Sequence, residues 1–296
     1  MNSNNALSVS AKLLPSGDRL GQFTLLRPIG KDSMGAVYLA WQEGLARQVA
    51  VKVLMKERFD QLITSDRFLQ EAETAANLDH PNIVTVYGQG EREDCIWFAM
   101  QFIEGPSVAE WLRRRAKHPI PSKRTIQLSE IRDLAKQMLL ALAHGHAAGV
   151  IHRDVKPENI LWAGSTGRAI LTDFGLASVN YFQHEAEKHF ILGSPLYVSP
   201  EQARGDELDG RADLFSLGCV LLELTLGYLP VRVERPEKIF RTRSSEDPRM
   251  FTGTARALNP NVPESWDAFL KKSLTPSRDF RFRDAQDMLD ALDRAL

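Results

Sequence analysis

Two parts of the chain differ in the spacing of their apolar residues. Between Gly21 and Met100, short β-branched or aromatic runs alternate with turn-forming residues, which predicts strands. These runs are 23–26, 36–41, 48–54, 83–87 and 95–98. The exception is a helix predicted at about 65–78. Apolar and acidic residues recur there at helical spacing: Phe68, Glu71, Ala72, Ala75 and Leu78.

Beyond Gly105 the apolar residues follow the longer period of helices. One long helix is predicted with a continuous apolar face made by Ile131, Leu134, Met138 and Leu142. Ser129 would cap this helix and Gly149 would end it. Short strands are expected near 151, 160 and 170, and further helices from about 211 onward. A strand-rich part followed by a helical part predicts an α+β fold with a cleft between two lobes.

Composition and charge narrow the class of protein. Of 296 residues, 43% are hydrophobic and 25% are charged, which is ordinary for a soluble globular protein. The formal net charge of −1 provides no general attraction to nucleic acid or to an anionic membrane. No apolar run approaches the roughly 18 residues that a membrane helix needs. We therefore expect a cytoplasmic protein that binds no nucleic acid and has no membrane segment in this chain.

The first candidate site is the segment 29–38, which reads IGKDSMGAVY. Alternation continues through Val37, Leu39 and Trp41, so a strand follows the glycines. A dinucleotide-binding turn would lead into a helix instead. A turn between two strands predicts a flap whose backbone lies over phosphates. The signal is weak by itself, because an ordinary hairpin turn has the same pattern.

A lysine ends the apolar run VAVK at 49–52. Alternation places Lys52 and Ala50 on one face of the strand, with Val51 and Val53 on the other. Glu71 lies among apolar neighbours on the predicted helix at 65–78, and an unpaired buried carboxylate is costly. Lys52 is the natural partner for Glu71. The alternative is a solvated lysine on an edge strand.

The most specific segment is 152–159, which reads HRDVKPEN. Asp173 stands 14 positions beyond Asn159, at the start of the tripeptide DFG. A carboxylate and an amide converging on one site suit Mg²⁺, which prefers oxygen ligands and shares them with phosphates. A second carboxylate, Asp154, would then receive the proton of a hydroxyl group.

In this order and spacing, the segments resemble the eukaryotic-type protein kinase family, and within it the bacterial serine/threonine kinases. The signatures run from the glycine loop through VAVK, the helix glutamate, HRDVKPEN and DFG to the pair Pro200-Glu201. The segment 213–218 resembles the family's buried aspartate segment on a central helix. Arg281 or Arg283 would supply the arginine that pairs with Glu201.

The resemblance covers about residues 20–294 and implies the bilobal protein kinase fold. The expected parts are a flexible lead-in at 1–18, a β-rich N-lobe with one key helix at 19–100, a hinge at 101–105 and a larger helical C-lobe at 106–296.

The resemblance also implies the catalytic residues of an enzyme that uses ATP. Lys52, positioned by Glu71, would hold the α- and β-phosphates. Asp154 would be the catalytic base, and Lys156 would neutralise charge on the transferring phosphoryl group.

The same resemblance implies the contacts to ATP and metal. Asn159 and Asp173 would hold Mg²⁺, with Mn²⁺ as an alternative ion. Met100 would guard the back of the adenine pocket, and the backbone from Gln101 to Ile103 would bond the adenine edge. The flap and the walls of the adenine pocket would contribute Ile29, Gly30, Gly35, Val37, Ala50 and Leu161.

Two further segments imply the substrate class. The DxKPxN form at 154–159 and the peptide-binding stretch GSPLY at 193–197 are similar to those of serine/threonine kinases. The expected partners are protein substrates with serine or threonine acceptors, the chain itself included.

One residue departs from the family pattern. Asp32 replaces the second glycine of the flap and brings a negative charge toward the phosphates, which predicts weakened affinity for ATP. Two alternatives to an active protein kinase stay open, and Asp32 supports only the first of them. One is a pseudokinase scaffold that binds nucleotide with impaired transfer, and the other is a phosphotransferase acting on small molecules.

Overall fold

The computed structural model describes eight stretches of the chain: 13–31, 35–58, 76–118, 126–163, 166–174, 195–232, 242–245 and 250–296. The chain divides into two compact units. The sheet unit comprises Met1–Leu62 and Val86–Phe102, and the helical unit comprises Ile63–Thr85 and Ile103–Leu296. Most of the helix predicted at 65–78, Glu71 included, lies outside the described residues. The lobe limits predicted from the sequence stay a prediction.

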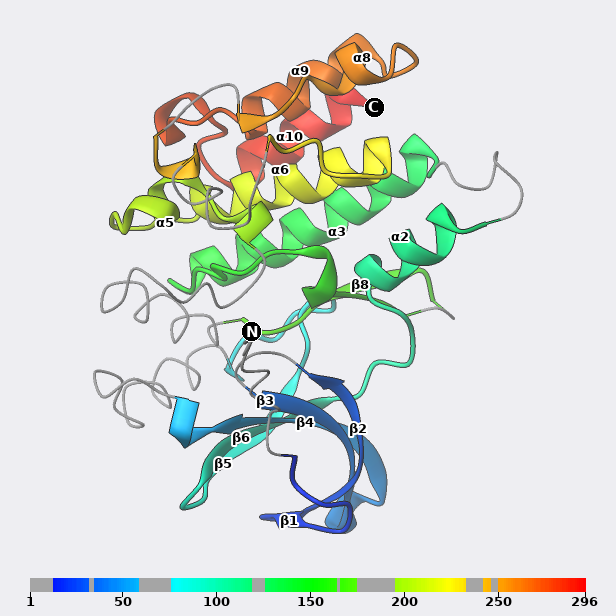
Figure 1. Cartoon of the computed structure of the whole chain (residues 1–296), viewed down its shortest axis with the longest axis vertical. Coiled ribbons are helices and arrows are strands. Elements are labelled where there is room, and N and C mark those ends of the chain that lie inside the picture. Colours follow the sequence, from blue (N-terminus) through cyan, green and yellow to red (C-terminus); the bar gives the residue numbers. More distant parts are fainter. Residues whose placement is uncertain are drawn as a thin grey trace, which may run out of the picture. The chain divides into compact units, whose positions relative to one another are not determined.

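In its described part, the sheet unit is a six-stranded antiparallel sheet that curls strongly (Figure 1). Its strands are β1 (Arg19–Leu20), β2 (Phe23–Lys31), β3 (Gly35–Gln42), β4 (Arg47–Met55), β5 (Val86–Glu91) and β6 (Cys95–Gln101), in the order β1-β2-β3-β4-β6-β5. Side chains from one face of the sheet form its core, among them Phe23, Leu25, Tyr38, Val51, Val53 and Trp97. The α+β class is thus confirmed, with six of the described strands gathered in one unit.

One predicted strand is wrong in its limits. The run 83–87 was expected to be a strand, but β5 begins only at Val86 and continues to Glu91. Ile83 and Val84 belong to the helical unit, where the backbone N–H of Val84 donates to the carbonyl of Leu171 at 3.0 Å. Residues of this one β-branched run therefore belong to two different units, and the sequence pattern does not show where the division falls.

The helical unit is built around one apolar helix. Its helices are α2 (Val108–Ala116), α3 (Leu128–Ala147), α5 (Pro200–Arg204), α6 (Arg211–Leu226), α8 (Ala255–Leu258), α9 (Glu264–Ser273) and α10 (Ala285–Ala295), and its hairpin is β7 (Ile160–Ala163) with β8 (Arg168–Leu171). Nearly every residue of α6 is buried. A helix that is apolar on all sides must be covered on all sides, and α6 packs against α3, α9 and α10 (Figure 1).

The long helix α3 confirms the predicted apolar face but not its predicted cap. Ile131, Leu134, Met138 and Leu142 are all buried. The cap is Gln127, whose backbone N–H donates to the Glu130 carboxylate at 3.0 Å, so Ser129 lies within the first turn. Gly149 follows the end of the helix with a φ of +76°, a left-handed conformation that favours glycine.

The strand predicted near 151 is absent from the described segment 150–156, whereas those near 160 and 170 are confirmed as β7 and β8. The apolar pair Val150-Ile151 leads into an irregular loop. The next two backbone N–H groups, those of His152 and Arg153, donate to the carboxylate of Asp213. The Asp213 carboxylate therefore accepts the backbone hydrogen bonds that a neighbouring strand would otherwise accept.

A strand glycine provides a test of packing in the sheet unit. At Gly35, a Cβ would overlap the carbonyl oxygen of Val53 on β4, so Gly35→Ala forces two strands apart. We expect a lower urea midpoint, corresponding to a loss of about 1–3 kcal/mol or more. Gly88→Ala on β5 is the matched control, because its Cβ would meet nothing within 4 Å. Equal midpoints for the two variants would contradict this account of Gly35.

Candidate active site

A buried aspartate on α6 holds the segment 152–159 in place. Asp213 is 1% exposed. Its Oδ2 accepts the backbone N–H of His152 at 2.8 Å, and its Oδ1 accepts that of Arg153 at 2.8 Å. The Nε2 atom of His146 lies 2.8 Å from Oδ2. The sequence prediction of a buried aspartate on a central helix is confirmed, and its carboxylate organises the loop by accepting backbone hydrogens.

The surroundings of Asp213 keep its carboxylate ionised. Burial by itself raises the pKa of this carboxyl. The hydrogen bond from His146, the nearby imidazoles of His146 and His152, and the backbone N–H of His152 outweigh burial, so the pKa lies below its ordinary value. An ionised acceptor makes shorter and stronger hydrogen bonds than a neutral one, which suits a group that fixes two backbone amides.

Two residues of the candidate site have left-handed backbones. Arg153 has a φ of +67° and Asp173 a φ of +65°. Such conformations are costly for residues other than glycine and persist only when neighbours hold them. For Arg153 these neighbours are Asp213, at its N–H, and Gln202, whose Nε2 donates to its carbonyl at 2.7 Å.

His152 is a packing residue. It is fully buried, its ring lies 4.6 Å from that of Phe174 in an edge-on contact, and its Nδ1 accepts the backbone N–H of Asp154 at 3.2 Å. Its Nε2 lies 2.7 Å from the carbonyl oxygen of Thr172. Because a carbonyl only accepts, Nε2 carries the proton. His152 thereby ties the loop of Asp154 to the segment that leads into Asp173.

Two predicted catalytic residues, Asp154 and Lys156, and the predicted metal ligand Asn159 meet at one oxygen atom. Oδ2 of Asp154 accepts from Nζ of Lys156 at 2.7 Å and from Nδ2 of Asn159 at 2.9 Å. The same Nδ2 atom donates to the backbone carbonyl of Asp154 at 2.9 Å. The side chains of Asp154 and Lys156 are 23% and 15% exposed. Among the described residues none donates to Oδ1 of Asp154, so one carboxylate oxygen is oriented but open.

The β7–β8 hairpin brings the two predicted metal ligands to the same end. β7 begins directly after Asn159, β8 ends two residues before Asp173, and Ile160 pairs with Leu171. The backbone N–H of Thr172 donates to the carbonyl of Asn159 at 2.9 Å. Since the Asn159 amide nitrogen is engaged by Asp154, its oxygen is left for a ligand. A carboxylate and an amide oxygen at one hairpin end fit a hard cation such as Mg²⁺.

In the sheet unit, the predicted nucleotide contacts share one face. The register places Gly30, Val37, Lys52 and Phe98 in one row across four strands. Ala50 and Met100 pair in a neighbouring row on the same face of β4 and β6. Lys52 is 8% exposed. The alternation that placed Lys52 and Ala50 opposite Val51 and Val53 is confirmed, because those valines belong to the core of the other face.

The remaining predicted site residues are distributed between the two units. In the sheet unit, Ile29 is exposed on β2 and Gln101 ends β6. In the helical unit, Ile103 is buried and Leu161 lies half-buried on β7. The flap residue Asp32, the predicted ion-pair partner Glu71, Gly175 and the residues 193–194 lie outside the described part of the chain.

Two flap glycines differ in whether packing within the protein requires a residue without a side chain. Gly35 is required by its close approach to Val53. Among the described residues, a Cβ at Gly30 would meet the Cβ of Val37 alone, at the ordinary contact distance of 3.9 Å. Gly30 therefore has no packing reason to be glycine, which fits a position where backbone must come close to a ligand.

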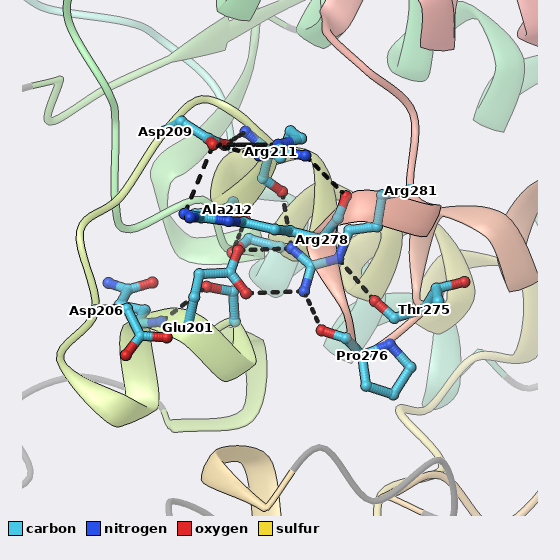
Figure 2. Close-up of polar contacts among 12 residues, drawn as sticks. Glu201, Asp206, Asp209, Arg211, Ala212, Thr275, Pro276, Arg278 and Arg281 are labelled. Atoms are coloured by element: carbon cyan, nitrogen blue, oxygen red, sulfur yellow. Dashed lines mark hydrogen bonds and ion pairs between the residues drawn. The ribbon is translucent and has the colours of Figure 1, made fainter.

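The arginine that pairs with Glu201 is Arg281. Its Nη1 and Nη2 atoms lie 2.6 and 2.8 Å from the two carboxylate oxygens, and both side chains are buried (Figure 2). The other Arg281 N–H groups donate to the backbone carbonyls of Thr275, Pro276 and Arg211. Arg283, the alternative, pairs with Asp284 at the surface. The ion pair fixes α5 to the segment that follows α9.

Three positioning residues were not predicted from the sequence. Gln202 bonds the carbonyl of Arg153, Ser216 donates to the carbonyl of Tyr197 at 2.8 Å, and Arg243 donates to that of Leu196 at 2.6 Å. Gln202 directly follows the Pro200-Glu201 pair, so the sequence motif at least indicated its position. Arg243 lies in the polar stretch RTRSSEDPR, where no pattern separates a buried arginine from a solvated one.

The Glu201–Arg281 pair predicts a large difference between two neighbouring arginines. Arg281→Met leaves a buried carboxylate without its cation, so we expect a loss of about 3–5 kcal/mol in unfolding free energy. Arg283→Met is the matched control and should unfold close to the parent chain, since its ion pair is exposed. Urea unfolding of both variants measures the difference, and similar losses in both would contradict the assignment.

Comparison with known proteins defines the class. The protein kinase domain family matches residues 23–291, so the chain belongs to the protein kinase family. The serine/threonine-protein kinase PrkC of Bacillus subtilis is 36% identical over 271 residues, covering 90% of this chain and 39% of that protein. PknF of Mycobacterium tuberculosis is 32% identical over 289 residues, covering 96% of this chain and 58% of PknF. The chain thus spans about two fifths to three fifths of these two relatives.

Solved structures agree with the fold. The crystal structure of the PknI kinase domain of Mycobacterium tuberculosis has a TM-score of 0.75 and 27% identity, covering 96% of this chain and 100% of that one. The predicted protein kinase fold and the resemblance to bacterial serine/threonine kinases are confirmed. The pseudokinase alternative rests on Asp32, and neither the site nor these relatives favour it. Within the described residues, no helix combines the length and apolar character needed to cross a membrane.

Proposed function

We propose that the chain transfers the γ-phosphate of ATP to serine or threonine hydroxyls of protein substrates, in a reaction that depends on Mg²⁺. The observation that carries the proposal is the convergence of Lys156 and Asn159 on one oxygen of Asp154, in a loop whose backbone Asp213 holds. The PrkC and PknF relatives, named as serine/threonine-protein kinases, support the substrate class.

Asp154 acts as the catalytic base. Its Oδ2 is held by Lys156 and Asn159, so Oδ1 is the oxygen that accepts the hydrogen of the substrate hydroxyl. The hydroxyl oxygen forms a bond to the γ-phosphorus while the bond from that phosphorus to the bridging oxygen of ADP breaks. The proton passes to Asp154. Orientation supplies much of the acceleration, because a held acceptor needs little reorganisation in the transition state.

Lys156 serves both the base and the phosphoryl group. Its ammonium lies 2.7 Å from the Asp154 carboxylate and is partly exposed, so it can also face an incoming phosphoryl oxygen. There it neutralises negative charge that spreads over the transferring group. We propose Asn159 and Asp173 as the ligands of Mg²⁺, with Mn²⁺ as an alternative. The bound ion would neutralise charge on the phosphates.

Most of the proposed nucleotide contacts belong to the sheet unit, whereas Ile103 and Leu161 belong to the helical unit. Lys52 holds the α- and β-phosphates, with Glu71 as its proposed partner, and the backbone of Gly30 approaches the phosphates. Met100 lies behind the adenine, whose edge bonds the backbone from Gln101 to Ile103. The other proposed contacts are Ile29, Gly35, Val37, Ala50 and Leu161.

The test compares phosphoryl transfer from γ-labelled ATP by the parent chain and by Asp154→Asn. We expect acid-stable label on serine or threonine of a generic basic protein, and a loss of at least about 100-fold in the variant, because the base is removed. Asp290→Asn, the same change on the exposed face of α10, is the matched control and should transfer normally.

Three results would overturn the proposal. Undiminished transfer by Asp154→Asn would remove the base from the mechanism. Label found on free metabolites but never on protein would indicate a small-molecule phosphotransferase. Nucleotide binding without any transfer would restore the pseudokinase alternative, with Asp32→Gly as the next variant.

A further inference from the structure

Arg243 is a buried cation in an unusual environment. The residue is 1% exposed, and among the described residues no carboxylate forms an ion pair with it. Its Nη1 atom contacts Sδ of Met250 at 2.6 Å, and its Nη2 donates to the carbonyl of Leu196 at 2.6 Å. Its Nε atom is buried without a hydrogen-bond partner. Burial of a charge is costly unless its hydrogen bonds compensate for the lost solvation.

Aromatic faces and a thiol complete the surroundings of this guanidinium. The Cζ atom of Arg243 lies 5.1 Å from the ring centre of Phe215 and 4.9 Å from that of Phe251. Sγ of Cys219 lies 4.0 Å from Nη2, and burial raises the pKa of this thiol to about 11, so it is neutral. Burial also lowers the pKa of Arg243; Cys219 opposes this, whereas the nearby charge of Arg281 adds to it.

Among the described residues, the backbone group that Arg243 bonds belongs to the segment 195–199. This segment begins with a 3₁₀ turn at Pro195–Tyr197 and ends at Ser199, the cap of α5. The next carbonyl, that of Tyr197, accepts from Ser216, and the Tyr197 hydroxyl donates to Glu223 at 2.5 Å. Of these anchored positions, Leu196 comes first in the chain.

The segment connects directly to the catalytic loop. Beyond Ser199, α5 is locked by the Glu201–Arg281 pair, and Gln202 bonds the carbonyl of Arg153 beside Asp154. The C-terminal side of the segment is therefore held by several contacts. At Leu196 the backbone carbonyl is bonded by the guanidinium of Arg243, which lies later in the chain.

We propose that Arg243 is a positioning residue for the acceptor-binding segment 195–199 and sets the affinity for the protein substrate rather than the rate of phosphoryl transfer. The inference rests on the proposed function and on the family resemblance, which implies that the stretch 193–197 binds the protein substrate. A guanidinium suits this task because its planar fork reaches Leu196 and Met250 from two different nitrogen atoms while its face packs on Phe215. An apolar side chain would pack equally well but would leave the Leu196 carbonyl without its donor.

The test uses Arg243→Met in the full chain, with a serine-containing peptide as the substrate. Replacing a buried charge by an apolar residue of similar volume is often neutral or stabilising, so the melting temperature should not fall. We expect KM for the peptide to rise by about tenfold or more, while kcat and KM for ATP stay within about twofold. Met250→Leu is the matched control, since it removes the contact at Nη1 and keeps the bond to Leu196; its peptide KM should stay near that of the parent.

A second readout does not need activity. Hydrogen exchange of the segment 195–204 should be faster in Arg243→Met than in the parent chain, with no substrate present. The two proposals can fail separately. If the parent chain transfers no phosphate but exchange is still faster in Arg243→Met, the positioning role is supported and the proposed function is overturned. Unchanged exchange, an unchanged peptide KM, or an equal effect of Met250→Leu would each overturn the role of Arg243.

If Arg243→Met fails to fold, Arg243→Lys takes its place. A lysine keeps the charge but has a single donor group, which cannot reproduce the two contacts of the fork. We expect faster exchange of the segment 195–204 and a peptide KM raised by at least about threefold. A peptide KM equal to that of the parent would overturn the inference.

Discussion

The candidate site depends on one carboxylate that accepts two backbone hydrogens. The loop that carries Asp154 lies outside any sheet, so the N–H groups of His152 and Arg153 have no strand partner, and a buried N–H without an acceptor is costly. Asp213 supplies both acceptor oxygens from the buried helix α6. With those two amides fixed, Arg153 can keep its left-handed backbone. The orientation of Asp154 toward Lys156 then follows from the loop itself.

Other buried polar contacts fix the backbone elsewhere in the helical unit in the same way. Glu201 is held by Arg281 through a bidentate buried pair, which fixes α5, and Gln202 on α5 returns to the carbonyl of Arg153. The loop is thus held at two N–H groups by Asp213 and at the carbonyl of Arg153 by Gln202. Buried polar groups are used here to specify one backbone arrangement, and the buried carboxylate of Glu201 has its cation in Arg281. The buried cation Arg243 differs, because none of the described carboxylates pairs with it.

Features set by neighbouring residues could be predicted from the sequence, whereas features set by distant residues could not. A two-residue period is local, so the face of Lys52 on β4 was predictable, and the dense motif at 152–159 identified the chemistry. The choice between Arg281 and Arg283 was not predictable, since both stand in the same polar context and only tertiary packing buries one of them. The apolar pair at 150–151 has the pattern of a strand, but its loop bonds a carboxylate 60 residues away. Arg243 gave no signal, because burial of a lone arginine depends wholly on distant residues.

The most direct test of the central claim is the unfolding free energy of Asp213→Asn relative to the parent chain, measured with urea between pH 8 and pH 4. The amide cannot accept both backbone hydrogens with two oxygens, so the variant should be less stable by about 3 kcal/mol or more. Because the pKa of Asp213 is lowered in the folded state, this advantage is complete above the unfolded value near pH 3.9 and is lost only as pH falls through the folded value. The account predicts an advantage of the parent chain that does not diminish between pH 8 and pH 5. A variant as stable as the parent, or an advantage that already fades between pH 7 and pH 5, would contradict it.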